Sequence, residues 1–325
     1  NSNNPETVRR FVESAFTERF QQIAPIEEHV EILLGIYQET GGIAFHGIRS
    51  YVPERNDGTV VILKDNIFDS WRAFLIGFDE GEDSLIAGLR FADARSPSDV
   101  KVEALNEQEV IEKIRSIVEG LVERNVFSGT VLVAKGSDVL YSAAAGGASK
   151  RFHVANNIDT KFNLGSMNKM FTSVAVMQLV EQGKINLNDP LSMYLDETWL
   201  PKDVTEEITI HHLLTHTSGL GSYFNQKYME GSRALWRKLD DYKPLIRDDR
   251  PAFEPGGRFQ YSNTGMFLLG AVIENVTGKS YFDFVRESIH IPAGMKNTDC
   301  YEMDDPVENL AIGYLPDRNS PYKAG

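Results

Sequence analysis

The sequence predicts a mixed α+β protein built from two domains, and three observations support this. The chain has 325 residues, more than a single hydrophobic core usually organises. Helical patterns at its start are followed by short β-rich segments, an order typical of an α+β domain. A polar segment around Pro97 then leads into a region with a hairpin pattern and several helical patterns. We therefore expect a first domain over residues 1–100 and a second over residues 101–325.

The first domain is expected to contain two amphipathic helices and an antiparallel sheet. Apolar side chains recur at helical spacing over residues 5–22, and again from Ile26 to Tyr37. Short β-rich segments begin at Ile43 and include TVVILK, WRAFLIGF and SLIAGLRF. The turn-like sequences RNDG and DEGEDS separate them. These elements predict a small α+β domain that ends near Ala94.

The second domain begins with a predicted helix over residues 107–124. The sequence SGTVLVAKGSDVLYSAAAG, residues 128–146, predicts a β-hairpin with KGSD at its turn. Helical patterns follow over residues 166–183, 208–216 and 264–277, and proline and glycine residues lie between them.

The composition argues against several classes of function. With 42% hydrophobic and 25% charged residues, the chain is typical of a folded protein. Its formal net charge of −14 repels polyanions, so we expect no nucleic-acid partner. The one cysteine, Cys300, cannot form an internal disulfide. No run of about 18 apolar residues occurs, so we expect no membrane span.

The stretch FNLGSMNKMFTSVAVMQLVEQGK, residues 162–184, contains an S-x-x-K motif at the start of a predicted helix. Ser166 and Lys169 are three residues apart, so on a helix their side chains share one face. A serine hydroxyl needs a neighbouring base to act as a nucleophile, and a desolvated lysine can serve as one. The backbone N–H groups of Gly165 and Ser166 are expected to face a developing oxyanion. The alternative interpretation is a helix cap and a solvated lysine.

A second motif, Y-x-N, lies at Tyr261, Ser262 and Asn263, just before the apolar helical pattern that begins at residue 264. Polar groups at this place could form a second wall of a cleft around Ser166. A phenol near the Lys169 cation has a lowered pKa and becomes a base near neutral pH. The alternative for Tyr261 is a packing tyrosine whose hydroxyl is bonded to a backbone carbonyl.

Four segments carry a resemblance to a known family: GSMNKMFTSVAVMQLVEQGKINLNDPL, ITIHHLLTHTSGL, PGGRFQYSNTGMFLLGAVIENVTGKS and IHIPAGMKNT. Their order and spacing resemble the bacterial serine β-lactamase and penicillin-binding-protein superfamily, in the branch related to class C β-lactamases, D-aminopeptidases and family VIII esterases. The resemblance runs from about residue 107 to the end and implies a β-lactamase/transpeptidase-like fold there. Residues 1–100 more weakly resemble small cystatin-like or NTF2-like modules, which implies a lid or association module.

The resemblance also implies roles for individual residues. Ser166 is the expected acylated nucleophile and Lys169 its proton acceptor. Tyr261 is expected to pass the proton to the leaving group and to activate the deacylating water. Asn263 is expected to donate a hydrogen bond to the acyl side chain of the substrate. No cofactor and no metal are implied, and His211, His212 and His216 lack the acidic partner of a zinc motif, so we expect them to be structural.

One element of the family pattern is not found. The family carries a strand with Lys or His, then Thr, Ser or Gly, then Gly, and HTSG at residues 216–219 lies in a helical region instead. The β-lactamase-like domain is therefore expected to be C-terminally incomplete. Because one oxyanion donor comes from that strand, we expect weak catalysis, or a second polypeptide or further C-terminal segment that completes the site.

The predicted function is a serine hydrolase that forms an acyl-enzyme on a small ester, amide or peptide substrate. An esterase or D-amino-acid peptidase is expected, with β-lactamase activity weak at most. Two alternatives stay open: a penicillin-binding DD-carboxypeptidase or transpeptidase, and an acylated sensor or binding protein without turnover. The resemblance implies a periplasmic or secreted location.

Overall fold

The structure is a computed structural model that describes residues 3–50, 58–79, 81, 84–101, 104–302 and 304–314. Helices and strands are mixed, as predicted. Contacts divide the chain into two compact units, Asn1–Thr160 with Tyr314–Gly325 and Lys161–Gly313. The expected division into residues 1–100 and 101–325 stays a prediction.

Three helices open the first unit: α1 (Pro5–Ala15), α2 (Glu18–Gln21) and α3 (Ile26–Thr40). The Asn4 side chain caps α1 by accepting from the N–H of Thr7 at 3.1 Å. A single helix over residues 5–22 was predicted, and this is wrong at Phe16. Phe16 is extended and forms a bridge with Ile86, and the N–H of Thr17 donates to the Ile86 carbonyl at 3.0 Å. Pairing with a strand therefore interrupts the helical pattern.

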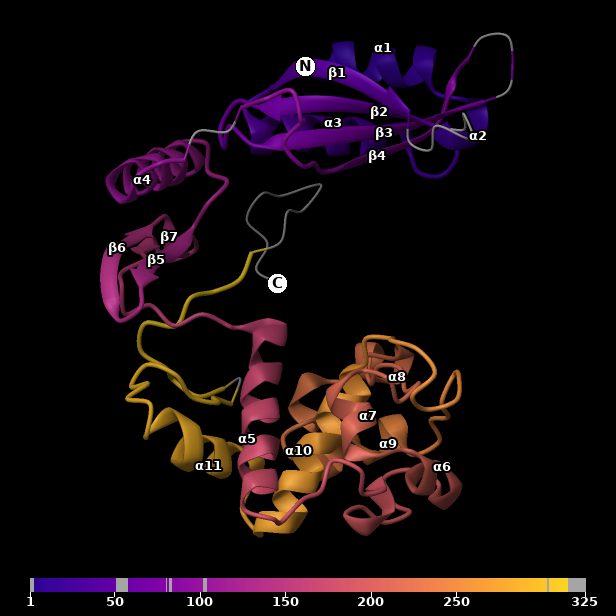
Figure 1. Cartoon of the computed structure of the whole chain (residues 1–325), viewed down its shortest axis with the longest axis vertical. Coiled ribbons are helices and arrows are strands. Elements are labelled where there is room, and N and C mark those ends of the chain that lie inside the picture. The colour runs from indigo at the N-terminus through magenta and orange to yellow at the C-terminus, as the bar shows by residue number, and fades with distance from the viewer. Residues whose placement is uncertain are drawn as a thin grey trace. The chain divides into compact units, whose positions relative to one another are not determined.

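The predicted antiparallel sheet is present in the order β1-β2-β3-β4. Its strands are β1 (Ile43–Ser50), β2 (Thr59–Asp65), β3 (Trp71–Phe78) and β4 (Ile86–Asp93). In Figure 1 helices α1 and α3 run along this sheet, and a small apolar core joins α1, α3 and β4. Residues 55–57 of the RNDG turn and residues 80, 82 and 83 of the DEGEDS turn lie outside the described residues.

The same unit continues with α4 (Glu107–Glu123), which begins at a capping box formed by Asn106 and Glu109. The predicted hairpin is confirmed, because β5 (Gly129–Lys135) pairs with β6 (Asp138–Ala145) around a turn at residues 136–137. Two short strands, β7 (Gly147–Ser149) and β8 (Val154–Ala155), form a separate antiparallel pair.

The second unit is helical. Its α-helices are α5 (Lys169–Glu181), α6 (Lys202–Glu207), α7 (Ile210–Leu214), α8 (Gln226–Glu230), α9 (Lys243–Ile246), α10 (Asn263–Thr277) and α11 (Tyr281–Val285). Shorter turns are η1 (Gly165–Asn168), η2 (Leu191–Met193), η3 (Arg233–Leu235), η4 (Leu239–Tyr242) and the π-helical η5 (Arg286–His290). Helix α10 lies in the main core and packs against α5, α7 and α11 (Figure 1).

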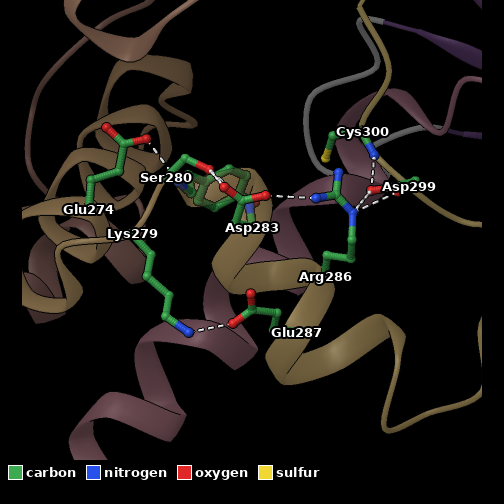
Figure 2. Close-up of polar contacts among 9 residues, drawn as sticks. Glu274, Lys279, Ser280, Asp283, Arg286, Glu287, Asp299 and Cys300 are labelled. Carbon is green, nitrogen blue, oxygen red and sulfur yellow. Dashed lines mark hydrogen bonds and ion pairs between the residues drawn. The ribbon is translucent and has the colours of Figure 1, made fainter.

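Polar contacts around α11 tie the end of the second unit to α5 and α10. Figure 2 shows Arg286, whose Nε donates to both carboxylate oxygens of Asp299 at 2.8 and 3.0 Å. The Glu274 carboxylate of α10 accepts from the N–H of Tyr281 at 2.8 Å. The Tyr281 hydroxyl shares a 2.7 Å hydrogen bond with Thr172 of α5. These contacts hold α5, and with it the S-x-x-K segment, against the helical core.

Candidate active site

Ser166 lies in the short 3₁₀ turn η1, which runs directly into α5. The preceding Gly165 has a φ of 53°, a conformation that glycine adopts without steric cost. Its N–H donates to Oδ1 of Asn163 at 2.8 Å, so the expected role of the Gly165 N–H as an oxyanion donor is wrong. The N–H of Ser166 has no acceptor among the described residues. One backbone donor therefore remains next to the Ser166 hydroxyl.

Lys169 begins α5 one turn after Ser166. Its Nζ donates to Oγ of Ser166 at 3.1 Å. The spacing of three residues brings the two groups together because residues one turn apart share a helix face. Ser166 itself is exposed, and Lys169 is half-buried. The hydroxyl is therefore accessible to a substrate while it contacts the amine.

Tyr261 reaches the same hydroxyl from a distant part of the chain. Its OH donates to Oγ of Ser166 at 2.8 Å, and Nζ of Lys169 lies 4.9 Å from the centre of its ring. The pKa of Tyr261 lies below its usual value of 10, first because of Lys169 and then because of Ser166, whereas burial opposes this shift. The alternative of a packing tyrosine does not fit a phenol that is 46% exposed and bonded to Ser166.

A loop that follows α7 holds the segment around Tyr261. The carbonyl of His216 accepts from the N–H of Gln260 at 2.8 Å, and Nδ1 of His216 accepts from the N–H of Ser262 at 3.1 Å. The carbonyl of Gly221 accepts from the Ser262 hydroxyl at 2.9 Å. The sequence interpretation gave His216 no role at the site. The one available signal was its place in LLTHTSGL, directly after an apolar helical segment.

Asn263 is the first residue of α10, and the Ser262 side chain caps this helix by accepting from the N–H of Gly265 at 2.8 Å. The Asn263 amide donates to the Ser222 hydroxyl at 3.1 Å. Asn263 is thus two residues from Tyr261 but makes no hydrogen bond to Ser166, Lys169 or Tyr261. Ser222, which no motif indicated, is its partner.

The three histidines do not form a metal cluster. Nδ1 of His212 accepts from the N–H of Thr209 at 3.3 Å, within a capping box at the start of α7. His211 is exposed, and His216 contacts the Tyr261 segment. Among the described residues, no group of three or more His, Cys, Asp or Glu side chains is placed to hold a metal ion.

No helix in the described part of the chain combines the length and the apolar character needed to cross a membrane.

A serine contacted by both a lysine and a tyrosine, with the lysine one helical turn away, defines a class of serine hydrolase site. The family comparison agrees, since residues 114–324 match the profile described as Beta-lactamase. The chain therefore belongs to the Beta-lactamase family of serine hydrolases, which includes penicillin-binding proteins and esterases among its relatives. Its fold is β-lactamase/transpeptidase-like.

Individual relatives share only part of their length with this chain. It is 33% identical over 212 residues to Penicillin-binding protein 4* of Bacillus subtilis (strain 168), covering 64% of this chain and 46% of the relative. It is 31% identical over 221 residues to Esterase EstB of Burkholderia gladioli, covering 63% and 54%. A solved penicillin-binding protein from Bacillus halodurans superposes with a TM-score of 0.58 at 35% identity, covering 64% and 63%. The chain spans about half the length of the curated relatives it matches.

Proposed function

We propose that the protein is a serine hydrolase that forms an acyl-enzyme on a small ester or amide. The observation that carries the proposal is the convergence on Oγ of Ser166 of the Lys169 amine at 3.1 Å and the Tyr261 phenol at 2.8 Å. A serine between two groups that can exchange protons is the arrangement that nucleophilic acyl transfer requires.

The proposed reaction starts when Oγ of Ser166 attacks the substrate carbonyl carbon and its proton passes to the amine of Lys169, which is neutral at that point because its own proton has moved to Tyr261. The oxygen of the tetrahedral intermediate accepts from the N–H of Ser166, whose backbone has no other acceptor in the described residues. The bond to the leaving alcohol or amine then breaks, and Tyr261 gives its phenolic proton to that group and becomes a phenolate. In the second half, the Tyr261 phenolate takes a proton from water as the water oxygen attacks the acyl carbon. The bond from that carbon to Oγ of Ser166 then breaks, Lys169 returns its proton to Oγ, and the acid is released. The lowered pKa of Tyr261 supports both of its roles.

Mass spectrometry of the intact protein tests this proposal. The chain is treated separately with p-nitrophenyl acetate, with a cephalosporin and with a fluorophosphonate, and the adduct is located by peptide mapping. We expect a fluorophosphonate adduct on Ser166 and a transient acetyl adduct, both absent from Ser166→Ala. An adduct on another residue, or equal labelling of Ser166→Ala, contradicts the proposal.

The proposal also specifies a class of substrate. We propose an ester or a D-amino-acid amide, because the likeness to Esterase EstB favours ester chemistry and the S-M-N-K motif resembles the D-aminopeptidase branch. Exposed apolar side chains next to the site, Met167 and Phe259, suit an apolar acyl group. Rates with paired D- and L-phenylalanine amides and with p-nitrophenyl esters of increasing chain length distinguish the two substrate classes.

A penicillin-binding carboxypeptidase or transpeptidase is the second candidate, and the likeness to two penicillin-binding proteins favours it. Release of D-alanine from a peptide ending in D-Ala-D-Ala is its signature. An acylated sensor is the third, and it would give a burst of product without a steady state. Sustained ester turnover without D-alanine release argues against both.

We further propose that an additional segment or a second polypeptide completes the site. The second oxyanion donor is not assigned among the described residues, and Tyr261 is 46% exposed. Helix α5 also exposes the apolar side chains of Met170, Val174 and Met177. Loss of one oxyanion donor costs about 10²- to 10³-fold in rate, so a longer chain is expected to exceed this one by that factor. Equal turnover by both chains contradicts this part.

Residues 1–100 are proposed to act as an association module rather than a second active site. Two large apolar side chains, Phe45 and Ile48, are 66% and 58% exposed on the edge strand β1. Light scattering of Phe45→Lys tests this, since association through β1 predicts a lower mass per particle than that of the unsubstituted chain.

A periplasmic or secreted location is proposed from the bacterial relatives, and fractionation of the native cells tests it.

A further inference from the structure

His216 lies directly beside the phenol of the candidate site. The centres of the His216 and Tyr261 rings are 4.7 Å apart, with 36° between the ring planes. His216 has a φ of 56°, although it is not a glycine. Such a backbone conformation is sparsely populated by other residues and persists when surrounding contacts hold it in place. His216 is therefore fixed by its surroundings, next to a residue that must be positioned accurately.

His216 accepts two hydrogen bonds that bracket Tyr261. The His216 carbonyl accepts from the N–H of Gln260 at 2.8 Å, and its ring Nδ1 accepts from the N–H of Ser262 at 3.1 Å. Gln260 and Ser262 are the two neighbours of Tyr261 in the chain. One residue thus fixes the backbone on both sides of the phenol and packs against its ring.

The Ser262 hydrogen bond also defines the state of the imidazole. Because Nδ1 accepts a hydrogen bond from the N–H of Ser262, it carries no proton itself, and the neutral ring has its proton on Nε2. Burial lowers the pKa of His216 below its usual 6.5, and the nearby Lys169 cation lowers it further. The neutral ring is therefore the form that fits this place.

We propose that His216 is a positioning residue for Tyr261, and that its neutral imidazole keeps the phenol on Ser166. This inference rests on the proposed function, in which Tyr261 transfers protons. Beyond the proposed chemistry, the inference requires that Nδ1 of His216 accept a hydrogen bond. A protonated ring would present a donor to the Ser262 N–H, and that hydrogen bond would be lost.

The surroundings of His216 specify the pH range of the effect. In the described part of the chain, the titratable groups that act on it are Lys169 from α5 and Tyr261 from the segment before α10, and Phe259 packs edge-on against its ring at 5.9 Å. Lys169 adds a positive charge, so protonation of His216 places two cations near each other. We expect the positioning effect to be complete above pH 6.5 and to fall as the pH drops through the lowered pKa of His216.

Two substitutions separate positioning from simple packing. His216→Asn retains an acceptor oxygen close to the place of Nδ1, tolerates the positive φ and does not titrate in this range. His216→Ala removes the acceptor and the ring. His211→Ala is the matched control, because His211 is exposed and lies in the same segment. The rate of fluorophosphonate labelling of Ser166 is measured for each chain between pH 4.5 and 8, with thermal unfolding as the check of folding.

We expect His216→Ala to label about 10- to 100-fold more slowly than the unsubstituted chain, since small misplacements of a reacting group cost factors of this order. His216→Asn is expected to keep most of the rate and to lose the decline below pH 6.5. His211→Ala is expected to match the unsubstituted chain throughout. Equal rates for His216→Ala and the unsubstituted chain, or an Asn variant as slow as a folded Ala variant, overturn the inference. If His216→Ala does not fold, the pH profile of His216→Asn by itself tests the inference.

A second readout does not depend on catalysis. Fluorotyrosine placed at position 261 is titrated by ¹⁹F NMR in the unsubstituted chain and in both His216 variants. We expect His216→Ala to move the phenol midpoint toward that of the free amino acid, because the phenol leaves Lys169, and we expect His216→Asn to keep it. An unchanged midpoint in His216→Ala contradicts the positioning role. An unlabelled Ser166 in the unsubstituted chain contradicts the proposed function instead, and the NMR titration still decides the role of His216.

Discussion

The hydroxyl of Tyr261 donates a hydrogen bond to Oγ of Ser166 over 2.8 Å, although 95 residues separate the two in the chain. Lys169 donates to the same oxygen. The Ser166 oxygen therefore accepts two hydrogen bonds in the resting site. Its own proton can leave only when one of these donors becomes an acceptor, and this requirement makes the site testable by substitution and by pH.

Replacement of the phenol hydroxyl is the first test. Tyr261→Phe keeps the ring and its contact with His216 but removes the proton-transferring group. We expect the rate of p-nitrophenyl ester hydrolysis to fall by about 10²- to 10⁴-fold, the range of general acid–base catalysis. Tyr242→Phe is the control, because the Tyr242 hydroxyl bonds only weakly to the Trp236 carbonyl at 3.4 Å. A Tyr261→Phe rate within the range of the control would falsify the role of the phenol.

The second test concerns the charge next to Tyr261. Lys169 is the first cause of the lowered pKa of Tyr261, so Lys169→Met is expected to return that pKa toward 10. In deacylation the phenolate is the base, so the deacylation rate rises with pH through the Tyr261 pKa. The rising limb of the pH–rate profile should therefore move to higher pH in Lys169→Met, and the maximum rate should be lower. A rising limb at the same pH in both proteins would show that Tyr261 is not the titrating group.

Asn263 and Ser222 provide a test of substrate recognition. Loss of one hydrogen bond typically costs about 0.5–1.5 kcal/mol, so Asn263→Ala is expected to lower kcat/KM by about 2- to 10-fold for amides that carry a polar acyl side chain. Acetyl esters, which have no such side chain, should be affected little. Ser222→Ala removes the 3.1 Å partner of the Asn263 amide without removing the amide itself. The expected role of Asn263 is wrong if both substrate types lose the same factor.

Gly219 tests the loop that carries His216. Its φ is 77°, and a Cβ added there would lie 2.8 Å from the Phe253 carbonyl oxygen and 2.9 Å from Cβ of Pro251. Gly219→Ala is therefore expected to lower the free energy of unfolding by about 1–3 kcal/mol, the usual cost of a strained backbone position. Gly221→Ala is the matched control, because a Cβ there would meet no atom within 4 Å. Urea unfolding of both variants measures the difference, and equal loss in the two contradicts the prediction.

His290 gives the structure a dependence on pH that is unrelated to catalysis. Neither ring nitrogen of His290 has a hydrogen-bond partner among the described residues, and Phe171 packs edge-on against the ring at 5.0 Å. Burial lowers the pKa of His290 below 6.5, Asp299 opposes this and Arg286 adds to it. Because the unfolded chain binds the proton more readily, stability is complete above pH 6.5 and declines as the pH falls toward the lowered pKa.

His290→Leu removes this titration. Its free energy of unfolding is expected to fall less between pH 7.5 and pH 5 than that of the unsubstituted chain, as measured by urea unfolding at both values. His211→Leu, at an exposed position, should keep the original pH dependence. If the His290→Leu variant loses as much stability on acidification as the unsubstituted chain, another group is responsible.

Local patterns in the sequence predict much of this fold. The β5–β6 hairpin, the four-stranded sheet and helix α10 lie where alternation, turn residues and helical spacing predict them. The helical pattern over residues 5–22 failed at Phe16, because pairing with Ile86 outweighs local propensity there.

The candidate site, too, was predicted only in part. The contact between Ser166 and Lys169 follows from a spacing of three residues on a helix, and the place of Tyr261 next to them follows from the family resemblance. The engagement of the Gly165 N–H by Asn163 and the partnership of Asn263 with Ser222 did not follow from either. Each depends on where a loop turns.

The sequence by itself determined which local elements form and that Ser166 and Lys169 share one face of a helix, because periodicity and motif spacing act over a few residues. Only the tertiary structure decided that His216 brackets Tyr261 and that the N–H of Ser166 has no acceptor in the part of the chain that the structure describes. The contacts of His216 are hydrogen bonds between loops that are tens of residues apart, and their geometry depends on how the helices α5, α7 and α10 pack.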